Sequence, residues 1–228
     1  MSSQEILARQ QKMMGSWCGH HLESAGVVRV LNEGGSKPPI LWIFNTANEP
    51  EALASVLGSD QPLVFTRSAH LMVPPGQDPA ETRNCLADHF LTEVDRRFGG
   101  ETLNLGTSCQ GTGIALRFAQ NSWETGILVN ALCIINCSLP DVATGLPALL
   151  VYGSGDPLQD PFSKDAARAE KRAAQVFSNH QRCLLDAGHG QFYEPGVLKD
   201  ILREFASFAA AYSDIRVVNS AASSDTVG

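Results

Sequence analysis

The fold of this chain is decided by the stretch Leu103-Asn104-Leu105-Gly106-Thr107-Ser108-Cys109-Gln110-Gly111-Thr112-Gly113-Ile114-Ala115-Leu116-Arg117-Phe118-Ala119. Its apolar start predicts a buried strand and its end an amphipathic helix, with small residues forming a tight turn between them. Such a turn exposes one side chain at the top of a sheet, beside a helix N-terminus that favours developing negative charge. The stretch therefore predicts a nucleophile elbow.

Two neighbouring residues, Ser108 and Cys109, compete for the exposed position of this elbow. Gly111 lies two residues after Cys109, whereas counting from Ser108 puts Gln110 there, where a Cβ would crowd the turn. The position two residues before the nucleophile argues the other way. It is Thr107 for Cys109, whereas it is Gly106 for Ser108. The register favours Cys109 as nucleophile, and the plainer alternative is that Cys109 is a small buried apolar residue.

Length and composition indicate one ordinary globular domain. The 228 residues suffice for a single sizeable α/β domain, and 43% hydrophobic with 18% charged residues suit a soluble globule. The net charge of −7 argues against a general nucleic-acid binder, and no run of about 20 apolar residues predicts a membrane span. The 6 cysteines show no CxxC pairing, so we expect reduced thiols in a cytoplasmic protein without structural zinc.

Strand and helix patterns alternate along most of the chain, which predicts an α/β class: a mostly parallel sheet with helices on both faces. The expected strands are an edge strand at 27–31, then 40–44, 62–66, the run that begins at Leu103, 127–136, 148–152 and 183–185. The expected helices are 49–57, 79–98, the helix that follows the elbow, 162–177 and 197–212. We expect a leader at 1–24, forming a short polar helix or no fixed structure. The domain itself should span 25–213, and a disordered tail 214–228.

Two later strands each deliver a polar side chain just past their end. Asp156 follows the run 148–152, and His189 follows 183–185. Since open α/β sheets place their chemistry at the carboxyl ends of strands, we expect Asp156 to orient His189, and His189 to activate Cys109. The plainer interpretations are a turn aspartate and a loop histidine. Asp141, beyond the strand 127–136, is the second candidate for the acid.

These motifs together resemble those of the α/β hydrolases, and are most similar to thioesterase domains of polyketide and nonribosomal peptide assembly lines. The resemblance spans roughly residues 27–210. It rests on the run 35–44 as the entry to the first buried strand, on Gly188-His189 as a histidine loop, and on the elbow, where Gly111, Ala115 and Ala119 follow Cys109 at the family's spacing. It implies an α/β-hydrolase fold with a Cys109-His189-Asp156 triad and no cofactor or metal.

The resemblance also implies an oxyanion hole and an open site. One donor would be the N–H of Gln110, and the other would come from the loop after 40–44, Ala47 first and Thr46 next. That loop reads Asn45-Thr46-Ala47-Asn48, where relatives commonly carry His-Pro or His-Gly. The segment 139–147 is too short for the helical lid of those thioesterases, so the lid should be absent or minimal unless the loop 68–79 covers the site.

A cysteine nucleophile would hold its acyl group as a thioester, close in energy to a carrier-bound thioester substrate. Pairing with His189 is compatible with a resident thiolate–imidazolium pair. The resemblance thus implies a cytoplasmic thioesterase or acyltransferase of natural-product biosynthesis. It would take an acyl or peptidyl chain from a carrier protein and release it by hydrolysis, cyclisation or transfer. No nucleic-acid or membrane partner is expected.

Two alternatives stay open. The compact, lidless chain with its Cys–Asp–His order also resembles dienelactone hydrolases, so it would act on small esters, as a carboxylesterase does. It would otherwise be a non-catalytic binding module that keeps the fold.

An acidic carrier would fit the basic helix face formed by Lys164, Arg168, Lys171 and Arg172, although a solvated face is the plainer interpretation.

Overall fold

The computed structural model describes residues 1–73 and 78–224, with side chains up to Tyr212 in the last helix. Its centre is an eight-stranded sheet with the order β1-β2-β4-β3-β5-β6-β7-β8. At one edge, β1 pairs antiparallel with β2, and β2 pairs antiparallel with β4. From β4 to β8 every pair of neighbouring strands is parallel. The expected mostly parallel sheet is therefore confirmed, with one antiparallel edge.

The element bounds follow the predicted pattern closely. The strands are β1 His20–His21, β2 Arg29–Leu31, β3 Ile40–Phe44, β4 Leu63–Arg67, β5 Thr102–Ser108, β6 Leu128–Ile135, β7 Pro147–Gly153 and β8 Asn179–Leu185. The helices are α1 Ser3–Met14, α2 Glu49–Leu57, α3 Ala80–Phe98, the short 3₁₀ turn η1 Cys109–Gly111, α4 Thr112–Thr125, α5 Pro161–Lys164, α6 Ala166–Val176 and α7 Pro195–Ser224.

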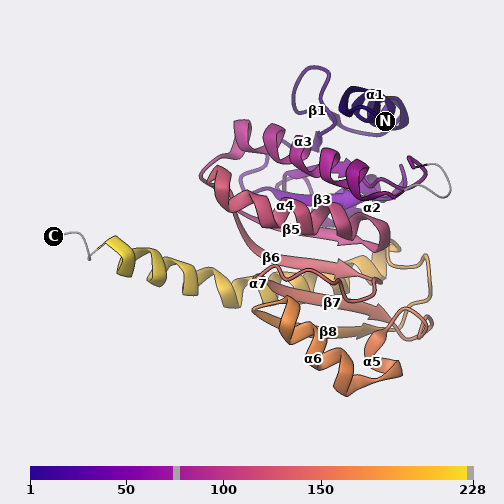
Figure 1. Cartoon of the computed structure of the whole chain (residues 1–228), viewed down its shortest axis with the longest axis vertical. Helices are drawn as coiled ribbons and strands as arrows, with labels where there is room; N and C mark the ends of the chain where they lie inside the picture. The colour runs from indigo at the N-terminus through magenta and orange to yellow at the C-terminus, as the bar shows by residue number, and fades with distance from the viewer. Residues whose placement is uncertain (74–77, 225–228) are drawn as a thin grey trace.

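Helices cover both faces of the sheet (Figure 1), and each face has its own apolar core. The central strand β3 shows why. Leu41 and Ile43 point into the core under α3 and α4, while Trp42 and Phe44 point into the core under α2 and α7. All four side chains are fully buried, because a parallel strand covered on both faces needs apolar residues on both.

The N-terminal segment belongs to this core. Helix α1 begins with a capping box between Ser2 and Glu5. Ile6 and Met14 are 1% exposed, and the buried Gln10 donates from Nε2 to the carbonyl of Arg67 at 2.7 Å. Sequence alone suggested a separate leader over 1–24, since the helix looks polar. Its narrow buried stripe instead packs residues 3–14 onto the domain.

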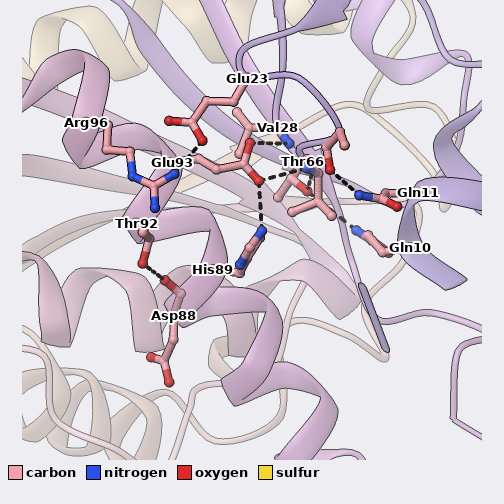
Figure 2. A network of polar contacts seen from close by, with 12 residues as sticks. Gln10, Gln11, Glu23, Val28, Thr66, Asp88, His89, Thr92, Glu93 and Arg96 are labelled. Carbon is pink, nitrogen blue, oxygen red and sulfur yellow. Dashed lines mark hydrogen bonds and ion pairs between the residues drawn. The ribbon is translucent and has the colours of Figure 1, made fainter. Parts of the chain in front are cut away.

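A buried carboxylate ties the antiparallel edge of the sheet to α3. Glu93 is 1% exposed and accepts hydrogen bonds from the N–H groups of Val27 (2.7 Å) and Val28 (3.2 Å), as Figure 2 shows. His89, one turn earlier on α3, lies 3.2 Å away through Nε2. A Cβ on Gly26 would lie 2.2 Å from Glu93 Oε2, so only glycine lets the chain approach the carboxylate this closely.

Three details differ from, or add to, the expected outline. The predicted helix 162–177 is two helices, because Asp165 caps α6 by accepting from the N–H of Arg168.

The segment 136–146 contains no helix, so it forms no helical lid, as expected. Of the loop 68–79, residues 74–77 lie outside the described part. Helix α7 continues to Ser224 where a disordered tail was expected, since neither Gly nor Pro interrupts it after Gly196. No helix of the described residues is long and apolar enough to cross a membrane.

Candidate active site

The turn between β5 and α4 bends at Cys109. This residue has a φ of +43°, in the left-handed region that residues other than glycine rarely adopt. A Cβ on Gly111 would lie 2.4 Å from Thr107 Oγ1 and 3.0 Å from the carbonyl of Ile43, so the position two residues after Cys109 has to be glycine. A strained residue in a tight strand–helix turn is the geometry of a nucleophile elbow.

Ser108 has a different environment. It is the last residue of β5, has an extended backbone and is 6% exposed. Its hydroxyl accepts hydrogen bonds from Asn45 Nδ2 (3.0 Å) and Tyr193 Oη (3.2 Å), and Tyr193 in turn accepts from Trp42 Nε1 (3.0 Å). Among the described residues, no hydrogen bond joins His189 to Ser108 or to Cys109. Ser108 is thus part of a buried polar chain, whereas Cys109 is half-buried at the surface of the site.

The structure brings Asp156 and His189 together at the carboxyl ends of β7 and β8. Asp156 Oδ2 lies 2.9 Å from His189 Nδ1, and the carboxylate side chain is 14% exposed while the imidazole is 69% exposed. The second candidate acid, Asp141, is 99% exposed and pairs with Arg172 on the surface. Only Asp156 of the two is placed to orient the imidazole.

Asn136 is a site residue that the sequence reasoning missed. It directly follows β6, has a φ of +51° and is 4% exposed. Its Nδ2 donates to Asp156 Oδ2 at 3.0 Å and lies 3.1 Å from His189 Nδ1. The hydrogen bond from Asn136 is the largest cause that lowers the pKa of Asp156, and the one with His189 is the second. Both favour the ionised carboxylate. The available signal was its position just past a strand, the same signal that marked Asp156.

These side chains line one small cavity of about 110 Å³. Its lining is formed by Asn45, Glu49, Ser108, Cys109, Ile135, Asn136, His189, Gly190, Phe192 and Tyr193. Elbow and histidine therefore face the same space, whose volume suits a small acyl group. No group of three or more His, Cys, Asp or Glu side chains in the described part of the chain is arranged to hold a metal ion.

The Cys109 thiol is neutral rather than ionised in this setting. Burial raises its pKa, and the nearby Cys137, Glu49 and Asp156 raise it further, while the N–H of Gln110 beside the sulfur lowers it. A resident thiolate–imidazolium pair was compatible with the sequence, but these surroundings disfavour the thiolate. The proton has to leave as the sulfur attacks, which requires a base.

The backbone N–H groups of the loop after β3 donate to a side-chain carboxyl group of the protein itself. Glu49, at the start of α2, accepts through Oε2 from the N–H of Asn45 at 2.7 Å and from that of Thr46 at 3.3 Å. Burial raises the pKa of this carboxyl. The predicted oxyanion donor Thr46 is thus engaged by the protein's own carboxylate, while Gln110 N–H faces the sulfur. The roles of Gln110, Ala47 and Thr46 stay predictions.

Sequence comparison finds no relatives: no family model matches the chain, and no curated protein matches it. Solved structures share its architecture. The NocB thioesterase domain from the nocardicin cluster is 14% identical with a TM-score of 0.62, over 81% of this chain and 99% of that one. YbtT, a type II thioesterase from the yersiniabactin pathway, is 15% identical with a TM-score of 0.55, over 82% and 100%.

A third similar structure is a serine hydrolase of carbazole degradation, the CarC enzyme. It is 13% identical with a TM-score of 0.57, over 81% of this chain and 99% of that one. At these identities the likeness concerns the fold, and the chain has the α/β-hydrolase fold. Because this neighbour is a serine enzyme, the comparison gives no support to a cysteine nucleophile.

Proposed function

We propose that this chain is a thioesterase or acyltransferase that forms an acyl-enzyme on Cys109. The observation that carries the proposal is the elbow: Cys109 has a φ of +43° and lines one cavity with His189, which Asp156 holds at 2.9 Å. Two neighbours in fold, NocB and YbtT, are thioesterases by name, which favours an acyl thioester as substrate.

In this mechanism the Cys109 sulfur attacks the thioester carbonyl while His189 takes its proton through Nε2. Asp156 stabilises the imidazolium, and the N–H of Gln110 stabilises the oxyanion. When the tetrahedral intermediate collapses, the bond to the leaving thiol breaks, and His189 returns the proton to that thiol. The product is a new thioester, close in energy to the first, so water, a hydroxyl or an amine can resolve it by the reverse sequence of proton transfers.

The partner in this proposal is an acyl or peptidyl carrier protein in cytoplasmic natural-product biosynthesis. Of the basic side chains that favour an acidic partner, Arg168 and Lys171 on α6 are exposed and form no ion pair in the described residues, whereas Arg172 pairs with Asp141. Lys164 donates to the carbonyl of Leu158. Lys164 keeps its charge in this exposed hydrogen bond, so among the described residues three of the four side chains of the predicted basic face have no acidic partner.

The test compares Cys109→Ala with Ser108→Ala after incubation with N-acetylcysteamine thioesters, using intact mass to detect the acyl adduct. We expect the adduct to be lost in Cys109→Ala and retained in Ser108→Ala. The reverse result would transfer the attack to Ser108. Absence of any adduct in the wild-type protein across several acyl groups would favour a non-catalytic binding module.

A second candidate is a hydrolase of small esters, similar to dienelactone hydrolases or carboxylesterases. The cavity of about 110 Å³ and the lidless segment 136–146 favour it, because a long acyl chain finds little enclosure there. Faster turnover of simple lactones and esters than of the matching thioesters would support this candidate over the first.

A further inference from the structure

The carboxylate of Glu49 is the one charged group of the cavity that the proposed mechanism does not use. Its donors are all neutral: the N–H groups of Asn45 and Thr46, and the Thr46 hydroxyl. No lysine, arginine or histidine side chain forms an ion pair with it in the part of the chain that the structure describes. When ionised, this carboxylate is a negative charge without a paired cation in the same space as Cys109.

This charge conflicts with the attack on a neutral acyl group. The tetrahedral intermediate carries a negative oxygen beside Cys109, and Glu49 both repels it and occupies N–H groups of the loop that would stabilise it. The imidazolium that forms at His189 is paired with Asp156, so Glu49 still lacks a cation of its own. The conflict disappears if the substrate itself brings a positive charge that pairs with Glu49.

We propose that Glu49 makes this site selective for acyl groups that carry a protonated amine. The inference rests on the proposed acyl-enzyme at Cys109 and names its substrate class. The ammonium would pair with the Glu49 carboxylate and draw it from the N–H groups of Asn45 and Thr46, which are then free for the oxyanion. The cavity volume of about 110 Å³ favours short chains, such as an aminoacyl group.

Burial supports this assignment. The half-buried carboxyl has a raised pKa because burial penalises its charged form by more than the donors of Asn45 and Thr46 stabilise it. A bound amine would supply a cationic partner and favour the ionised carboxylate. Because Glu49 is half-buried, such a pair contributes more than one between fully exposed side chains. The chemistry of transfer is unchanged: the Cys109–carbonyl bond forms, the bond to the leaving thiol breaks, and His189 moves the proton between the two sulfurs.

The experiment uses two probes of nearly equal shape, the 3-aminopropionyl and the butyryl thioesters of N-acetylcysteamine. The rate of adduct formation at Cys109 is measured by intact mass on the full chain. We expect the wild-type protein to react about tenfold faster with the amine, the ratio that one partly buried ion pair supports. In Glu49→Gln, which keeps the shape and an acceptor oxygen, we expect the ratio to fall to about one.

The matched control is Glu51→Gln, two residues further along α2, where the side chain is exposed and outside the cavity. This variant should retain the wild-type preference. Equal rates for the two probes in the wild-type protein, or an unchanged ratio in Glu49→Gln, would overturn the selectivity while leaving the acyl-enzyme intact. Absence of an adduct with either probe would overturn the proposed function, and the selectivity with it.

Discussion

Asn136 holds the acid and the imidazole of the candidate triad in one arrangement. Its Nδ2, Asp156 Oδ2 and His189 Nδ1 lie within 3.1 Å of one another. Asp156 accepts from both neighbours when His189 carries its proton on Nδ1, the tautomer that leaves Nε2 free to act as base. Asn136 is therefore a positioning residue that acts through Asp156.

At this scale we predict that Asn136→Ala raises the pKa of Asp156, because the largest cause of its lowering is removed. We also expect kcat/KM to fall about fivefold, the equivalent of one hydrogen bond of about 1 kcal/mol. Carboxyl chemical shifts followed over pH measure the first effect, and turnover of a thioester the second.

Asn121→Ala is the matched control, since Asn121 donates to Asp88 at 2.8 Å on the surface in the same way. It should leave the Asp156 pKa and the turnover unchanged. A merely structural role for Asn136 would reduce stability without moving the Asp156 titration, and that result would contradict the prediction.

At the scale of elements, Glu93 couples stability to pH. Burial raises its pKa in the folded protein above the ordinary 4.5. The folded state thus binds this proton more tightly than the unfolded state, and the resulting stabilisation is present below pH 4.5 and lost as the pH rises through the raised value. We predict that the stability of Glu93→Gln lacks this dependence, so the difference between wild type and variant changes within that window.

Urea unfolding at a series of pH values measures the effect. Val27 and Val28 donate to different oxygens of Glu93, so the amide of the variant keeps the shape of the side chain and one of these two hydrogen bonds, and loses the other at every pH. The buried charge of the wild type is the cost that the variant removes. Glu101→Gln, on an exposed side chain, serves as control and should follow the wild-type curve. Parallel curves for wild type and Glu93→Gln would show that the carboxyl does not change its protonation on folding.

At the scale of the whole molecule, α1 is integral to the folded domain. We predict that Ile6→Ala lowers the free energy of unfolding by about 2–4 kcal/mol, because the side chain is 1% exposed and its removal leaves a cavity. Lys12→Ala, on the exposed face of the same helix, should change it by less than about 0.5 kcal/mol. Unfolding in urea measures both, and an independent leader would make the two variants alike.

The order of elements and the elbow could be predicted from the sequence, since both depend on neighbours along the chain. Apolar runs such as Ile40–Phe44 identify buried strands, and the spacing of Gly111 from Cys109 identifies the turn. Asp156 and His189 could be predicted for the same reason, because each directly follows its strand. Their pairing was a consequence of the parallel order, which puts the carboxyl ends at one edge.

Contacts between groups that meet across the sheet could not be predicted from the sequence. The buried stripe of α1, the Asn136 contact with Asp156, and the engagement of Ser108 by Asn45 and Tyr193 join residues far apart in sequence, and no local pattern encodes them. The same holds for the raised pKa of Cys109, because desolvation depends on everything that surrounds the sulfur. Local periodicity and turn sterics were therefore enough to predict the fold and the candidate residues. Folding then decided their charge states and partners, because burial and hydrogen bonding are properties of the assembled site.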